Sequence, residues 1–242
     1  MNNSLQKIAS NTDASLHPLL EKNDYGDDVL IIIGTDKGLC GPLNTNLFKA
    51  AERFRANHNN PKVIAVGKKV VTYARRTGFD MVAQFVDMPD HITTEDILPI
   101  SEMVMDKFLK EEYKSVTVLY TDFINTLTQK VRISPLLPIA QDEYAGEKDM
   151  ITAESEKEYV FEPSAKVLLK EILPYYVENS VYQVFLESKA SEHSARMVAM
   201  KNASENADEL KDDLELEYNR SRQAAITNEL LDITTAALSL DG

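Results

Sequence analysis

The last quarter of the chain constrains its fold most, because residues 188–240 contain neither glycine nor proline. Pro174 is the last helix-breaking residue before the terminal Gly242, so this stretch is predicted to lie in one uninterrupted helix. At about 1.5 Å of rise per residue the helix would be roughly 80 Å long. A compact domain made from the rest of the chain has a radius of gyration of only roughly 14 Å. We therefore expect the helix to extend well beyond the body that carries it.

The apolar residues of this helix fall on one narrow seam, at spacings of three and four residues. Charged residues flank the seam, which is typical of a helix that packs along another long helix in a coiled coil. The small side chains in the seam would let a partner helix approach closely. The predicted seam consists of Met197, Met200, Ala203, Ala207, Leu210, Leu214, Tyr218, Ile226 and Leu230, and the same spacing continues through Ile233, Ala237 and Leu240.

Buried strands and helices alternate before this helix. Residues 28–33 (DVLIII) form an almost wholly apolar run that ends at Gly34, as expected for a strand covered on both faces. The order of the elements predicts an α/β body with a Rossmann-like, mostly parallel sheet and flanking helices. The further predicted strands are 62–66, 81–86 and 115–120. The first predicted helix has Asn44 or Thr45 as its N-cap, and two more helices span 68–77 and 95–110.

The pattern changes after the fourth strand. Residues 126–134 alternate between apolar and polar side chains, which predicts a half-exposed antiparallel strand after a turn at Ile124 and Asn125. The long C-terminal helix is expected to start at Pro163. Its base is predicted to bind the sheet through Leu168, Ile172, Tyr175, Tyr176 and Tyr182.

The composition argues against several kinds of chemistry. A formal net charge of -13 disfavours nucleic acid as a partner. Gly34, Gly38 and Gly41 fit neither the dinucleotide-binding nor the P-loop spacing, and Pro42 removes a backbone amide from their turn. A structural turn is favoured there, with a nucleotide-binding α/β enzyme as an alternative. The single cysteine, the scattered histidines and the carboxylates, which are expected on solvated faces, predict no catalytic, cofactor-binding or metal-binding residue.

Five segments together closely resemble the gamma subunit of bacterial F-type ATP synthase. They are TDKGLCGPLNTNLFK (35–49), FINTLTQKVRISPLLPI (123–139), EPSAKVLL (162–169), ASEHSARMVAMKNASENA (190–207) and LEYNRSRQAAITNELLDI (216–233). The resemblance implies a non-catalytic rotor, the central stalk, which mechanically couples proton flow through the membrane c ring to ATP synthesis or hydrolysis in the alpha/beta hexamer. It implies the alpha, beta and epsilon subunits and the c ring as partners, and no cofactor. It places the protein peripherally at the cytoplasmic face of the bacterial inner membrane.

The resemblance also implies roles for individual residues. Arg222, Gln223 and Thr227 match positions that hydrogen-bond a beta-subunit loop. Glu192 and Arg196 match a pair near the coupling region, although their spacing alone predicts a surface ion pair worth under ~1 kcal/mol. Two further groups are implied: Tyr159 and Glu162 as foot residues that face the c ring, and Ile233, Ala236, Ala237, Leu238 and Leu240 as the tip that turns in the hexamer's bearing.

The chain departs from the family pattern at three points. Pro42 and Ala236 each replace a glycine. The family's long N-terminal helix is missing, and residues 1–24 resemble only its last turns and the loop after it. We expect either that the given start of the sequence lies inside a longer reading frame or that the protein is a truncated form. A truncated form could be a non-rotary scaffold that docks on epsilon and the c ring, which is the alternative function. The predicted domains are the helix remnant (1–24), the α/β foot (25–162) and the long helix (163–242), which forms half of an antiparallel coiled coil.

Overall fold

The computed structural model describes residues 17–58, 60–139 and 165–240, and within the last helix it describes the side chains of residues 167–236. The chain divides into two compact units, Met1–Arg196 and Met197–Gly242. This division falls inside the last helix, whereas the sequence places the domain boundary at residue 163. Among the described residues, no helix combines the length and the apolar character needed to cross a lipid bilayer.

The first unit is built on a five-stranded sheet in the order β3-β2-β1-β4-β5. β1 (Asp27–Ile33) is its centre, with Ile31 opposite Ile64 of β2 on one side and Val118 of β4 on the other, both in parallel pairing. β5 alone pairs antiparallel. The predicted Rossmann-like, mostly parallel sheet is therefore confirmed. The other strands are β2 (Lys62–Val66), β3 (Met81–Phe85), β4 (Tyr113–Asn125) and β5 (Thr128–Leu137).

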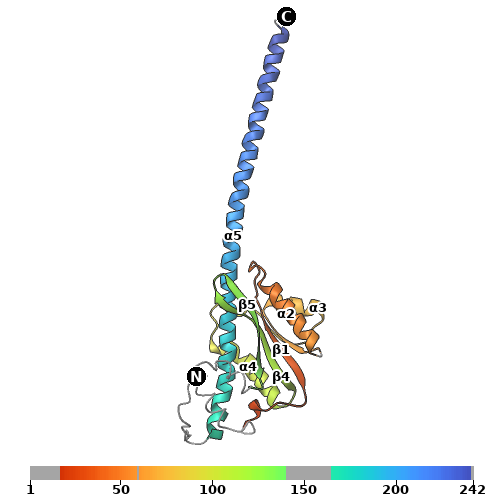
Figure 1. Ribbon diagram of the computed structural model, residues 1–242, viewed down its shortest axis with the longest axis vertical. Coiled ribbons are helices and arrows are strands. Elements are labelled where there is room, and N and C mark those ends of the chain that lie inside the picture. Colours follow the sequence, from red (N-terminus) through yellow and green to blue (C-terminus); the bar gives the residue numbers. More distant parts are fainter. Residues whose placement is uncertain (1–16, 59, 140–164, 241–242) are drawn as a thin grey trace, which may run out of the picture. The chain divides into compact units, whose positions relative to one another are not determined.

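Helices cover both faces of this sheet (Figure 1). One face packs against α2 (Leu43–Asn57) and α3 (Lys68–Thr77), and the other packs against α4 (Thr94–Leu109) and the first part of α5 (Ala165–Leu240). Successive side chains of β1 point to opposite faces, so Leu30 and Ile32 enter the first core while Val29, Ile31 and Ile33 enter the second. The short 3-10 helix η2 (Pro18–Leu20) adds Leu19 to the second core.

Several predicted boundaries differ from the structure, among them that of the strand 115–120, which is longer as β4, and two differ for local reasons. α2 begins at Leu43 with Pro42 as its N-cap, not with Asn44 or Thr45. Asn44 is instead a residue of the first helical turn, and its side-chain Nδ2 donates to Thr35 Oγ1 at 2.8 Å. The β4–β5 turn lies at residues 126–127, two residues later than predicted, because Asn125 Oδ1 accepts hydrogen bonds from the backbone N–H groups of Leu127 and Thr128.

α5 is one continuous helix from Ala165 to Leu240, which confirms the uninterrupted helix predicted for its C-terminal part. Its buried stripe in the first unit is displaced from the predicted one by a residue. Of the predicted residues, four are half-buried and do pack against the core, whereas Tyr175 is 51% exposed. The side chains that enter the core are Leu169, Leu173, Val177, Val181 and Phe185.

Candidate coupling site

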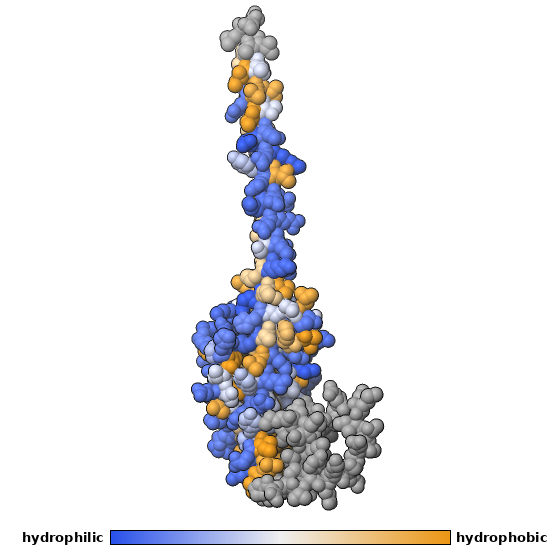
Figure 2. All heavy atoms as spheres, turned by 90° about the vertical axis from the view of Figure 1, so that its left-hand side faces the viewer, coloured by the Kyte–Doolittle hydropathy of each residue, from blue (hydrophilic) through white to orange (hydrophobic). Residues whose placement is uncertain are grey.

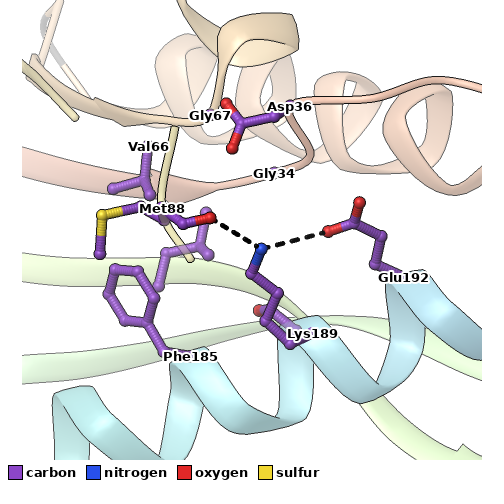
Figure 3. A pocket seen from close by; sticks show the side chains of 10 residues that line it. Gly34, Asp36, Val66, Gly67, Met88, Phe185, Lys189 and Glu192 are labelled. Atoms are coloured by element: carbon purple, nitrogen blue, oxygen red, sulfur yellow. Dashed lines mark hydrogen bonds and ion pairs between the residues drawn. The ribbon is translucent and has the colours of Figure 1, made fainter. Parts of the chain in front are cut away.

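The carboxyl ends of the parallel strands form the edge at which open α/β sheets usually bind ligands. Gly34 follows β1 and Gly67 follows β2 at this edge, and Gly67 has φ of +95°, which favours glycine. In this protein, side chains of α5 fill the region next to these strand ends. Phe185, Ser188, Lys189 and Glu192 line the same cavity as the two glycines (Figure 3). The cavity measures about 10 Å³, far below the roughly 300 Å³ of a small-molecule pocket, so this edge has no room for a nucleotide.

The charged part of this site centres on Glu192. Its side chain is only 7% exposed, and its Oε1 accepts from Arg196 Nη2 at 2.6 Å, one helical turn away. Lys189 Nζ lies 4.0 Å from Glu192 Oε2 and donates to the backbone carbonyl of Met88 at 3.4 Å (Figure 3). Asp90 lies 3.7 Å from the same ammonium group. The charges of Lys37 and, next, of Lys189 hold the pKa of Asp90 below its usual value.

Burial of Glu192 corrects the sequence-based expectation. Spacing alone predicted a surface ion pair, and the carboxylates were expected on solvated faces, but Glu192 is 5% exposed as a residue. The apolar stripe of α5 explains the difference, because the spacing that buries Val181 and Phe185 continues to Ser188 and Glu192. A carboxylate at this position is taken out of water and depends on its charged partners.

Two serines tie the same part of α5 to β4 and to the turn that follows it. Ser191 Oγ donates to the carbonyl of Thr121 at 3.0 Å, and Ser194 Oγ donates to the carbonyl of Thr126 at 2.8 Å. Both serines are buried. Arg196 adds a contact to the β1–α2 turn, since its Nε donates to the carbonyl of Gly38 at 3.4 Å.

Sequence reasoning identified Glu192 and Arg196 but missed Lys189, Ser191 and Ser194. The partners of these three residues lie 68 to 101 positions earlier in the chain and are mostly backbone carbonyls, which no spacing rule anticipates. A signal was nevertheless present. After Phe185 the buried positions of α5 are occupied by polar residues, and buried polar side chains require hydrogen-bond partners.

The first unit also contains the predicted glycine turn. Gly41 adopts φ of +58° and Leu39 adopts φ of +61°, so the turn is held in left-handed geometry at two positions. Cys40 between them is buried and free, and its sulfur accepts from Asn44 Nδ2 at 3.4 Å. The turn therefore presents a strained, internally bonded backbone.

The residues predicted to contact other subunits in the second unit lie on its exposed helix. Arg222, Gln223 and Thr227 are all exposed, and Thr227 Oγ1 donates to the carbonyl of Gln223 at 2.8 Å within the helix. Ile233 and Ala236 of the predicted tip are exposed too, whereas the side chains of Ala237, Leu238 and Leu240, and all of Tyr159 and Glu162, lie outside the described residues.

The predicted seam forms a series of apolar side chains on the second unit. Figure 2 shows hydrophobic side chains interrupting a mainly hydrophilic helix surface. Ala207, Leu210, Leu214 and Tyr218 line one shallow, mainly apolar strip, in which Leu210 is 59% and Tyr218 66% exposed. The other seam residues, Met197, Met200, Ala203, Ile226 and Leu230, are exposed as well.

Comparison with known proteins gives a consistent result. The chain matches the family model described as ATP synthase over residues 1–240. It is 39% identical over 231 residues to the ATP synthase gamma chain of Methylacidiphilum infernorum, covering 93% of this chain and 78% of the relative. It is 38% identical over 237 residues to that of Desulforamulus reducens, covering 98% and 82%.

The fold is similar to a solved structure as well. That structure is the cryo-EM structure of the central stalk and c ring of the mitochondrial ATP synthase of Tetrahymena thermophila. The TM-score is 0.62 and the sequence identity 26%, over 83% of this chain and 86% of that chain.

Proposed function

The chain belongs to the ATP synthase gamma-chain family, as its sequence predicted, and from this membership we propose that it works as the central-stalk rotor of an F-type ATP synthase. The rotor couples proton flow through the c ring to ATP synthesis or hydrolysis in the alpha/beta hexamer. Its partners are the alpha, beta and epsilon subunits and the c ring. The protein is peripheral to the membrane, at the cytoplasmic face of the bacterial inner membrane.

The observation that carries this proposal is the continuity of α5. One helix contributes Leu169 to Phe185 to the α/β core and continues without a break to Leu240. A continuous helix is held by backbone hydrogen bonds from residue to residue, of which α5 lacks the one that Pro174 cannot donate, and it transmits rotation along its axis better than two elements joined by a loop. Such an element suits a shaft, and its side chains leave only about 10 Å³ at the strand ends where an open α/β sheet usually binds its ligand.

The site assignments belong to the same proposal. Arg222, Gln223 and Thr227 bind a beta-subunit loop, and the seam from Met197 to Leu230 packs along a second helix. The tip from Ile233 to Leu240 turns against the hexamer through apolar contacts, which have no preferred direction. Tyr159 and Glu162 face the c ring. The exposure of the described side chains among these supports their availability for contact.

Reconstitution separates the rotor from the alternative, a non-rotary scaffold that docks on epsilon and the c ring. The full gene product is combined with alpha and beta subunits, and ATP hydrolysis is measured against alpha and beta alone. A rotor raises the hydrolysis rate, and a matched chain that ends after Arg196 does not. An unchanged rate, from a chain that binds purified epsilon in a separate assay, would favour the scaffold.

A further inference from the structure

The contacts of residues 188–196 surround α5 on two opposite sides. Successive residues of an α-helix are about 100° apart around its axis. Ser191 and Ser194 therefore share one side, and Lys189 and Arg196 lie on the opposite one. The serines bond the carbonyls of Thr121 and Thr126, while Lys189 and Arg196 bond the carbonyls of Met88 and Gly38.

These contacts differ in kind from the packing that precedes them. The stretch from Leu169 to Phe185 packs mainly through apolar side chains, with a hydrogen bond from the Tyr182 hydroxyl to the carbonyl of Ile92 at 3.3 Å. Turning the helix far about its own axis would carry these side chains out of the core, but apolar contact is non-directional, so the packing fixes the orientation of the helix only coarsely. A hydrogen bond weakens steeply as its angle departs from linear, so bonds on opposite sides of the axis oppose rotation in either sense.

Burying polar side chains at this part of α5 lowers the stability of the fold, which apolar side chains would not do. Thr121 Oγ1 and Ser188 Oγ are buried without a hydrogen-bond partner among the described residues, and Glu192 is a buried carboxylate. Apolar side chains of similar volume usually stabilise a buried helix as well or better. What the polar set adds is a fixed orientation of the helix against β4 and three connections, namely the β1–α2 turn, the β3–α4 loop and the β4–β5 turn.

We propose that residues 188–196 of α5 form a torsional clamp, in which Lys189, Ser191, Ser194 and Arg196 act as positioning residues that prevent the helix from slipping about its axis when the α/β body is turned. The inference rests on the proposed rotor function. Glu192 serves the clamp by holding the Arg196 guanidinium at 2.6 Å. No atom of the clamp needs to touch another subunit.

The test measures the torsional stiffness of the rotor in the assembled complex. The hexamer is fixed to a surface, a bead is attached to the α/β body, and the angular spread of the bead is recorded in the absence of ATP. The double variant Ser191→Ala/Ser194→Ala removes two bonds to the body. Slipped orientations should become about fivefold more frequent for each lost bond, which widens the spread.

Ser180→Ala is the matched control. Ser180 Oγ also donates to a backbone carbonyl at 2.8 Å, but that carbonyl belongs to Tyr176 of the same helix. This variant should keep the parent spread. Ser194→Thr, which retains a hydroxyl, should also stay close to the parent value, a rescue that a loss of packing would not show.

The outcomes are distinct. A double variant with the same angular spread as the parent overturns the clamp. If it does not assemble, Ser194→Ala alone carries the same test with a single lost bond. A parent complex that shows no ATP-driven rotation overturns the rotor function itself, and the clamp with it.

Discussion

At the scale of single residues, Glu192 holds the charged contacts of α5 together. Glu192→Ala leaves Arg196 without its carboxylate partner at a site where the Arg196 side chain is 24% exposed. We expect the free energy of unfolding of the chain to fall by about 2 to 3 kcal/mol, measured by urea denaturation. Glu205→Ala is the control, because the Lys201–Glu205 pair is exposed and 3.8 Å long. It should cost less than ~0.5 kcal/mol, and equal losses in the two variants would contradict the role of Glu192.

Tyr120 gives the first unit a dependence on alkaline pH. The residue is 4% exposed. Burial and, next, the charge of Glu187 raise its pKa from 10.0 to about 12. The folded chain then holds the phenolic proton more tightly than the unfolded chain, so the resulting stability is complete below pH 10 and is lost as the pH rises from about 10 to about 12.

Tyr120→Phe removes this titration. The variant's free energy of unfolding should decline less steeply than the parent's across that pH window. Lysines and other tyrosines titrate in both proteins, so their contribution cancels in the difference between the two curves. Parallel curves would show that Tyr120 titrates alike in the folded and unfolded chain.

At the scale of elements, the sequence was sufficient wherever one local signal decided the structure. The apolar run at 28–33 predicted β1 to within one residue, and the predicted helix 68–77 has the observed bounds of α3, which Gly67 and Gly78 flank. The base of α5 was harder, because two adjacent stripes are apolar at the same spacing. Tertiary packing chose Leu169 and Leu173 over Leu168 and Ile172, and periodicity contains no information about that choice.

The candidate site was predictable only in part, for a related reason. Resemblance to a family located Glu192 and Arg196. The hydrogen bonds of Ser191 and Ser194 end on backbone carbonyls of distant segments, and any residue type supplies a carbonyl. Only the assembled fold reveals such partners.

The seam of the second unit allows a direct comparison of two leucines. Leu214 lies in the seam, and Leu216, two positions on, points about 200° away from it. Their exposed fractions are 55% and 56%. Leu214→Asp should reduce the yield of the assembled complex, because a charge would enter the apolar contact with a second helix. Leu216→Asp should assemble like the parent, and an equal loss in both would argue against the seam.

At the scale of the whole molecule, the proposed rotor needs a connection at each of its two units. The first unit holds α5 through the bonds around Glu192, and the second has the exposed polar side chains that we propose to contact the catalytic subunits. If the first connection is weakened, α5 slips about its axis against the α/β body. If the second is weakened, the rotor loses its contact with the hexamer. The two are separable, since the former changes the torsional stiffness and the latter changes the turnover of a rotor that remains stiff.

Arg222 tests the second connection. Arg222→Ala removes a guanidinium whose hydrogen bonds to a beta-subunit loop would contribute about 1.5 kcal/mol, so ATP hydrolysis by the assembled complex should fall about tenfold. Arg220→Ala is the matched control, because Arg220 is also exposed and points to the opposite side of the helix. It should leave the rate within about twofold of the parent. If both variants hydrolyse ATP at the same reduced rate, the loss comes from the net charge of the helix rather than from a contact made by Arg222.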